Sequence, residues 1–437
     1  MSHPHRSPSP GILVGAVPRI ATVTFLFVVG IATLIGTVVL WPSGDSPTAP
    51  STTSSYAAPG VTFPRATVTA TLAPCPIDPG AAGSATPGAA GSPVPAQAGP
   101  GSTPATRTCG TITATVLEGA GAGQSVTIDA PTEVLRAGVH EGDRIVLLRL
   151  PDEAATASGA VLDSPYSYAG VERATPLWIL GVVFAVAVIA VARLRGLAAL
   201  IGLGIGGLVM IGFIAPSILQ GHSALAVAVV GSLLIMYVVL YLTHGLSLRT
   251  STALVGTIVG VALMAGVGEL AVGATRLTGV SDDDGGTLQA LAGSVSLQGL
   301  VTCGIIIGGL GALNDVTITQ TSAVWELSAA GSHLGRRQLF SSAMRIGRDH
   351  LASTVYTIVF AYVGGAMPVL LLLSLYSRPW GDVITSEDIA TELVRTMCSS
   401  FGLILAIPVT TLIAVLVATS GRGIPRHAGT ASPTHTP

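Results

Sequence analysis

The chain has 437 residues, of which 49% are hydrophobic and only 10% charged, and its mean hydropathy is +0.70. In soluble globular proteins about a quarter of the residues are charged, so this composition excludes that class and is typical of a polytopic membrane protein. The 20 cations, all of them arginine, face 22 acids and give a net charge of -2. This balance leaves no basic surplus, so a nucleic-acid partner is excluded.

Eight apolar runs are long enough, at about 17 to 25 residues, to cross a bilayer. They lie at 20–41, 176–192, 197–219, 223–242, 252–274, 291–313, 351–375 and 397–418. The run at 20–41 exceeds the apolar region of an ordinary signal peptide and no clear cleavage site follows Trp41, which predicts an uncleaved signal anchor. The expected fold class is an all-α polytopic membrane bundle of about eight helices, seven of them within 176–418.

Arginine is distributed unevenly between the two sets of loops, which predicts the orientation. The short outer loops hold only Arg276, Arg378 and Arg395. The predicted cytoplasmic segments hold Arg6, Arg19, Arg193, Arg195, Arg249, Arg336, Arg337, Arg345, Arg348, Arg422 and Arg426. Both termini are therefore expected in the cytoplasm, and the polar stretches 1–19 and 419–437 are expected to be disordered. The lack of lysine alongside abundant alanine, glycine, valine and arginine suggests a GC-rich bacterial genome, so the expected location is a bacterial plasma membrane.

Residues 42–175, between the first and second runs, differ from the rest of the chain. Linkers rich in Ser, Thr, Pro, Gly and Ala separate strand-like alternations at 66–72, 111–117, 124–130 and 143–150. This pattern predicts a small extracytoplasmic β-barrel-like domain. Cys75 and Cys109 both fall in this segment, where an oxidising compartment favours a disulfide; two unrelated free thiols are the alternative.

The familiar sequence signatures of enzymes are missing from the chain. It contains no G-x-S-x-G, H-E-x-x-H, P-loop or C-x-x-C motif. The G-x-G-x-x-G of Gly202 to Gly207 lies in the middle of an apolar run, where close helix packing explains it better than a dinucleotide turn. No enzymatic activity, cofactor or metal site is therefore expected.

The stretch GGLGALNDVTITQTSAVWEL at 308–327 is the most informative part of the chain. Four of its polar residues recur at intervals of 4, 3 and 4, which on a helix form one stripe: Asp315, Thr319, Ser322 and Glu326. Such a stripe could line a path for an ion or solute, because a carboxylate at membrane depth is normally paired or faces a cavity. If the span ends at residue 313, the stripe is instead the wet face of a surface helix.

A second polar face is expected in the following span. His350, Thr354 and Thr357, at intervals of 4 and 3, are positioned to meet the stripe that begins at Asp315. Arg345, Arg348 and Asp349 precede them and offer the counter-charge that an intramembrane carboxylate needs, or else form an ion-paired anchor. Residues 336–348 are expected to form a separate amphipathic helix at the membrane surface.

These two segments resemble the YibE/F-like family of bacterial multi-pass membrane proteins. The resemblance rests on GGLGALNDVTITQTSAVWEL (308–327) and RIGRDHLASTVYTIVFAYVGGAMPVLLLL (345–373), and extends over residues 60 to 418. It implies a shared fold plan and a transport-type role, and it carries over four polar positions: Asp315, Glu326, Arg348 and Asp349. The chain departs from the family pattern at Asn314, His350 and Tyr356.

Together these features predict a permease or efflux-type transporter for an ion or small polar solute. The alternative is a non-transporting envelope protein whose outer β domain binds a partner and whose helices anchor it. The lipid bilayer is the expected partner in both cases, and a homo-oligomer or an envelope partner stays open.

Overall fold

The computed structural model describes residues 14–43, 60–73, 110–151, 164–280, 285–286, 288–289, 292–331, 333–375 and 379–421. The chain forms two compact units, residues 49–184 and residues 1–48 with 185–437. We call them the β unit and the helical unit. Cys75 and Cys109 lie outside the described residues, so their disulfide remains a prediction.

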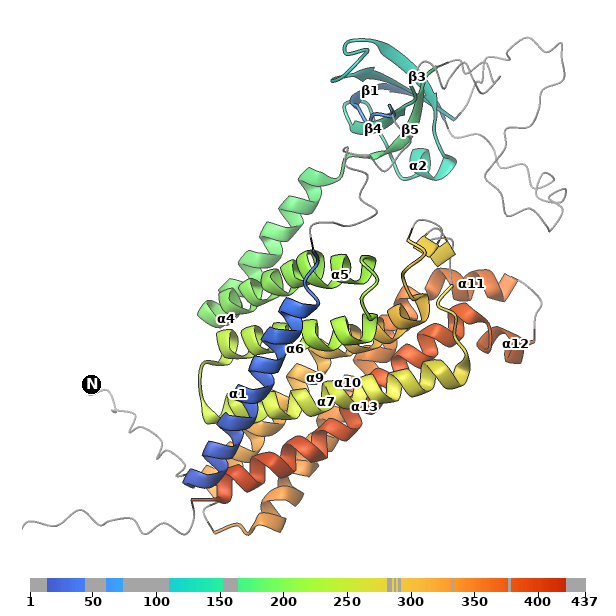
Figure 1. The fold of residues 1–437 in the computed structure, drawn as a ribbon. Helices are drawn as coiled ribbons and strands as arrows, with labels where there is room; N and C mark the ends of the chain where they lie inside the picture. The colour runs from blue at the N-terminus through green and yellow to red at the C-terminus, as the bar shows by residue number, and fades with distance from the viewer. Residues whose placement is uncertain are drawn as a thin grey trace, which may run out of the picture. The chain divides into compact units, whose positions relative to one another are not determined.

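The β unit contains one antiparallel sheet of five strands in the order β3-β2-β1-β4-β5 (Figure 1). The strands and the short helix α2 are β1 (Arg65–Thr71), β2 (Thr111–Val116), β3 (Ser125–Asp129), α2 (Thr132–Arg136), β4 (Arg144–Arg149) and β5 (Tyr166–Val171). Four strands lie at the alternating segments that the sequence predicts. The fifth, β5, was not predicted, since YSYAGV alternates poorly.

Alternation of apolar residues builds the core of this sheet. Every second residue of β2 points inward, and Ile112, Ala114, Ile145 and Leu147 are fully buried. Tyr166 of β5 closes the core, and its hydroxyl donates a 2.6 Å hydrogen bond to the carbonyl oxygen of Ala120. The result is a small β half-barrel with its own hydrophobic core.

The helical unit is a bundle of long apolar helices (Figure 1). In chain order the helices are α1 (Ala16–Val39), α4 (Ala174–Val209), the π-helix η2 (Met210–Ile214), α5 (Ala215–Leu219), α6 (Ala224–His244), α7 (Leu248–Thr275), α9 (Leu297–Ala330), α10 (Arg336–Gly365), α11 (Met367–Leu375), α12 (Trp380–Ile384) and α13 (Glu387–Thr419). Within the described residues, six helices are long and apolar enough to cross a membrane, or seven if α10 and α11, bent by 58°, form one span.

Glycines bring α7, α9 and α13 into close contact at the centre of the bundle. Gly260 faces Leu313, Gly402 faces Met264, and Gly256 faces Thr410, each so closely that a Cβ atom would overlap its neighbour. Small residues let helix backbones approach in this way. These three helices form the buried core on which the others pack.

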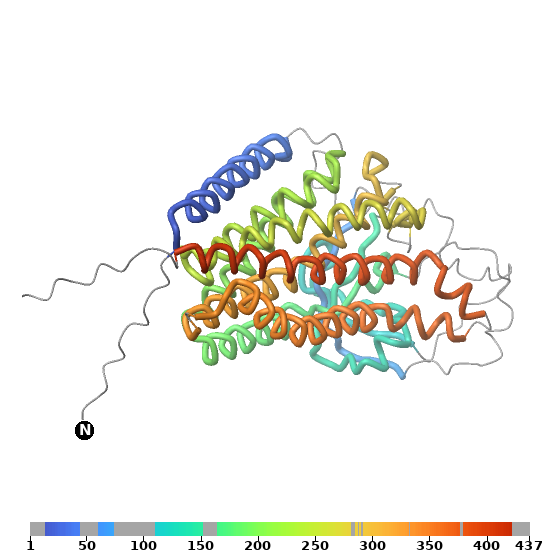
Figure 2. The backbone as a smooth tube through the Cα atoms, turned by 90° about the horizontal axis from the view of Figure 1, so that it is seen from below, coloured from blue at the N-terminus to red at the C-terminus, as the bar shows by residue number. Residues whose placement is uncertain are grey.

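Contacts between helix termini define two ends of the helical unit. At the first, which we call the Ser420 end, the Gly15 amide donates to Ser420 Oγ at 2.8 Å and Arg336 Nε donates to Thr419 Oγ1 at 3.1 Å. Figure 2 shows the start of α1 and the end of α13 side by side there. At the opposite end, the Ser43 end, the Ser43 amide donates to Gln220 Oε1 at 3.0 Å.

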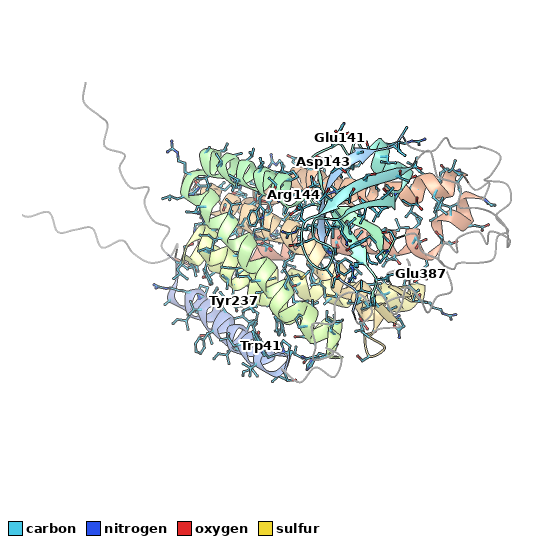
Figure 3. The ribbon with its side chains drawn as sticks, turned by 90° about the horizontal axis from the view of Figure 1, so that it is seen from above. Trp41, Glu141, Asp143, Arg144, Tyr237 and Glu387 are labelled. Carbon is cyan, nitrogen blue, oxygen red and sulfur yellow. The ribbon has the colours of Figure 1, made fainter. Side chains whose placement is uncertain are left out.

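Helix α1 packs on α6 mainly through polar and small residues. The Tyr237 hydroxyl donates a 2.7 Å hydrogen bond to the Leu26 carbonyl, and Gly30 lies against the same ring. Figure 3 shows Tyr237 and Trp41 at this face of the unit. The helix begins at Ala16, inside the segment 1–19 that was expected to be disordered. Pro18 is tolerated because the first turn of a helix needs no amide donor there.

The chain reverses direction within α4. Arg193 has φ 55° and ψ -134°, far from helical values. Beyond it, a Cβ on Gly196 would lie 2.5 Å from the carbonyl oxygen of Val188, eight residues earlier, which a straight helix does not permit. The break lies between the two predicted runs at 176–192 and 197–219.

Two predicted span boundaries differ from the observed helices. α9 does not end near residue 313 but continues to Ala330, because the polar segment contains no Gly or Pro between Gly311 and Gly331. α10 begins at Arg336, so residues 336–348 are the first turns of this long helix and not a separate surface helix. A hydropathy criterion ends a predicted span at the first charged residues, whereas the backbone hydrogen bonds of the helix continue through these residues.

Candidate functional site

The predicted polar stripe lies on α9, the same helix that forms the centre of the bundle. Hydroxyl groups beside the stripe bond to the helix itself: Thr317 Oγ1 donates to the Asn314 carbonyl at 3.1 Å, and Thr321 Oγ1 to the Thr317 carbonyl at 2.8 Å. Such bonds satisfy hydroxyl groups inside a helix. The polar residues therefore do not interrupt α9.

Helix contacts give the depth of the stripe in the bundle. Thr317 shares a buried 2.8 Å hydrogen bond with Thr257, and the adjacent Gly256 packs on Thr410. Thr410 is ten residues from Ser420, so Thr410 and the Thr317 side chain at the same level lie about 15 Å from the Ser420 end. On α9, Asp315 is two residues farther from that end than Thr317. Since the 24 residues of α1 extend for about 36 Å, Asp315 is near the middle of the bundle.

Asp315 contacts His350 of α10. The distance from His350 Nε2 to Asp315 Oδ2 is 3.3 Å, and the exposed fractions of the two side chains are 32% and 63% respectively. Thr319 Oγ1 approaches the other carboxylate oxygen at 3.5 Å. His350 Nε2 is buried without a well-oriented hydrogen bond, so the contact is mainly electrostatic, and it is an ion pair only when the imidazole is protonated.

A buried amide fixes α9 and α10 next to this pair. Gln320 Nε2 donates a 2.8 Å hydrogen bond to the Ala343 carbonyl. Its Oε1 lies against Gly347, where a Cβ would be only 2.7 Å away. Gln320 was not singled out from the sequence, although its polar side chain within a largely apolar helix was a usable signal. It holds the two helices in register.

The other predicted residues are distributed around the pair. Thr354 is buried and donates to the His350 carbonyl at 2.9 Å. Ser322 is half-buried, and Glu326 and Thr357 are exposed. Arg345, Arg348 and Asp349 are also exposed, and within the described residues none of them forms an ion pair. The group that contacts Asp315 is therefore His350 and not either arginine.

Arg395 is a polar residue that sequence reasoning assigned to an outer loop. It lies instead in the third turn of α13, where its Nη1 contacts Glu392 Oε1 at 2.6 Å and its guanidinium lies 6.0 Å from the centre of the Tyr362 ring. The glycines of α9 make room for both groups, because Gly304 faces Arg395 and Gly308 faces the Tyr362 hydroxyl. Gly304 and Gly308 have the G-x-x-x-G spacing that is typical of close helix packing, and charged and aromatic side chains fill the space beside them.

Two polar clusters lie on one side of α9: the Asp315 cluster, formed with His350, and the Arg395 cluster, formed with Glu392 and Tyr362. Gly304, Gly308, Gly311, Asp315 and Thr319 follow one another at intervals of 4, 3, 4 and 4, which places them on one helical face. The Arg395 cluster is nearer the Ser43 end, and the Asp315 cluster is near the middle. Among the described residues, no group of three or more His, Cys, Asp or Glu side chains could hold a metal ion.

These features define a multi-pass α-helical membrane protein with a partly exposed polar face on α9, one of its central helices. Comparison with protein families adds a particular assignment. The family described as YibE/F-like protein matches residues 180–420, more than half of the chain. The chain belongs to this family.

The match begins beyond α1 and the last strand, β5, so it is shorter than the resemblance over 60 to 418 suggested. It includes both polar clusters. Comparison with curated proteins and with solved structures gives no match.

Proposed function

We propose that this protein is a permease or efflux-type transporter that moves a proton, a small cation or a small polar solute across a bacterial plasma membrane. The observation that carries the proposal is the contact between Asp315 and His350 midway along the bundle. A carboxylate in the hydrocarbon region costs about 2.5 to 3.5 kcal/mol on insertion scales. Because the Asp315 side chain is partly exposed, we expect water or a polar ligand beside it.

The path follows the face of α9 that α10 adjoins. Asp315 and His350 hold the migrating ion or solute, and Thr319 orients the carboxylate. Arg395 and Tyr362 control access nearer the Ser43 end, where the guanidinium selects by charge. Gln320 is a positioning residue, since it fixes the spacing of α9 and α10 without facing the path. This arrangement requires no covalent chemistry.

The proposed topology has eight spans, with α4 contributing two because it reverses at Arg193, and α10 with α11 contributing one. The Ser420 end is cytoplasmic and holds both termini. Its arginines, among them Arg19, Arg249 and Arg336, follow the excess of positive charge on the cytoplasmic side of membrane proteins. The Ser43 end, which carries the acids of α12 and α13, faces outward.

Proton flux into proteoliposomes provides a direct test. The full-length protein is reconstituted with a pH-sensitive dye inside the vesicles, and a potential is imposed with potassium and valinomycin. We expect flux above that of protein-free vesicles, and the loss of most of this excess flux for Asp315→Asn and for His350→Gln. Asp382→Asn, which removes an exposed carboxylate of α12, is the matched control and keeps the flux.

The proton form of the proposal fails if the wild-type flux equals that of empty vesicles. A cation is then examined in the same vesicles with radioactive rubidium and sodium. The whole transport proposal fails if the Asp315 and His350 variants fold normally and every flux measured for the wild-type protein is unchanged.

The β unit supports the second candidate function, a non-transporting envelope protein. Its sheet has a separate buried core, as expected for a module that binds a partner. Removal of residues 42–175 from the full chain distinguishes the two functions. An envelope anchor loses its function in the cell on this deletion and is insensitive to Asp315→Asn. A transporter keeps its function on the deletion and loses it with Asp315→Asn.

A further inference from the structure

A cavity of about 700 Å³ opens at the Ser420 end of the helical unit, away from the Asp315 cluster. Its walls come from the start of α1, the turn between α6 and α7 with the first residues of α7, and Trp325 of α9. The volume falls within the range of about 300 to 1,000 Å³ that is typical of small-ligand sites. The proposed pathway does not use this cavity.

The polar part of the lining is positively charged. It contains Arg19 from α1 and Arg249 from α7, together with Ser247 and Ser251, and it contains no carboxylate. Neither arginine has an ion-pair partner among the described residues. Two guanidinium groups that face one cavity repel each other, and a shared anion removes this repulsion.

The start of α7 adds to the attraction for an anion. Ser247 caps this helix by accepting a 3.1 Å hydrogen bond from the Thr250 amide, and the partial positive charge of a helix start extends over the first turn. The Ser251 hydroxyl is already bonded to the Tyr241 hydroxyl at 3.0 Å. The two arginines therefore carry most of the binding.

The rest of the lining is apolar. Trp325, Val14, Val23, Leu246 and Leu248 surround the charged groups, and the Leu246 side chain is 87% exposed. Tryptophan is enriched where membrane proteins meet lipid headgroups. A soluble anion makes no use of these side chains, whereas an amphipathic anion covers them with its apolar part.

We propose that this cavity binds the phosphate headgroup of an anionic membrane lipid. Arg19 and Arg249 contact the phosphate oxygens, and Trp325 and Leu246 pack against the glycerol and the upper acyl chains. The lipid joins α1 to α7 and α9. Free phosphate shares the headgroup chemistry, so the test includes it as a separate ligand.

Native mass spectrometry of the delipidated full-length protein measures this binding. The probes are palmitoyl-oleoyl phosphatidylglycerol, the zwitterionic phosphatidylcholine with the same chains, and inorganic phosphate. We expect phosphatidylglycerol to bind at least about tenfold more tightly than phosphatidylcholine, and this preference to disappear in the Arg19→Gln, Arg249→Gln double variant. The Arg19→Lys, Arg249→Lys variant keeps most of it, because the charge is conserved.

Arg337→Gln is the matched control, since Arg337 is an exposed arginine at the same end but outside the cavity, and it keeps the preference. If inorganic phosphate at millimolar concentration displaces phosphatidylglycerol from the wild-type protein, the anion site is supported and a soluble phosphate is its occupant. Equal binding of the two lipids, or an undiminished preference in the Gln double variant, overturns the proposal. If that variant does not fold, Arg19→Gln alone replaces it and is expected to weaken the preference.

Discussion

A carboxylate and an imidazole from different helices meet halfway along the helical bundle. The side chain of Asp315 is 63% exposed while His350 Nε2 is buried, so the open side of the pair is the side of Asp315. At the scale of single residues, the transport proposal rests on this pair.

The pair is expected to act as a unit. Asp315→Asn and His350→Gln should each remove most of the proteoliposome flux, and the double variant should lose no more than the worse of the two single variants, since each substitution already breaks the contact. The measurement is a double-mutant cycle on initial flux rates. Strictly additive losses on a logarithmic scale would show that the two residues act independently.

Gly402 offers a test of the central packing. A Cβ there overlaps Met264, so Gly402→Ala should destabilise the protein by about 1 to 3 kcal/mol. Gly266→Ala is the matched control on α7, because nothing lies within 4 Å of its added Cβ, and it should be neutral or slightly stabilising. Thermal unfolding of both variants in detergent measures the difference, and equal midpoints would contradict this account of the helix contacts.

At the scale of elements, the reversal in α4 decides whether this helix crosses the bilayer once or twice. Gly196 permits the reversal, since a side chain there would overlap the Val188 carbonyl. Gly196→Val should therefore reduce the yield of folded protein, whereas Arg193→Gly should be tolerated because glycine adopts the positive φ of this position without strain. Size-exclusion profiles and thermal midpoints of the two variants provide the measurement. A normal Gly196→Val protein would argue against the reversal.

The β half-barrel should respond to changes in its own core. Ile145 is fully buried, so Ile145→Ala should cost about 2 to 5 kcal/mol of local stability. Ser125→Ala is the control, since Ser125 is exposed at the start of β3. Hydrogen exchange of the full-length chain should show faster exchange in β1 and β4 for Ile145→Ala alone. Unchanged protection in those strands would contradict the core assignment.

At the scale of the whole molecule, local patterns were enough to predict the helical bundle and four of the five strands. Long apolar runs and period-two alternation are properties of neighbouring residues. The extension of α9 is also local, but hydropathy misses it because the polar residues after 313 still form a helix. The contact of His350 with Asp315 and the contact of Arg395 with Tyr362 depend on packing against other helices, which hydropathy does not encode.

The same limit applies to the candidate site. Intervals of three and four residues placed Asp315 and Thr319 on one face, and they suggested that the His350 face would meet it. They did not identify which charged group reaches Asp315, because Arg345, Arg348 and His350 are all near in sequence and only their direction on α10 separates them. Gln320 was missed for the same reason, since its partner is a backbone carbonyl 23 residues away.

Cysteine accessibility along α9 tests the central claim most directly. Single cysteines replace residues 315, 319, 322 and 326 in a chain whose four native cysteines are removed, and membrane-impermeant thiol reagents are applied from each side of intact membranes. The account predicts reaction at 315 and 319 through water, at rates that fall toward the middle of the bundle. At 319, where Asp315 is retained, the rate is expected to decrease further when a transported ion is present. Absence of reaction at 315 and 319, or equally fast reaction of all four positions from the cytoplasmic side alone, would contradict a pathway along this face.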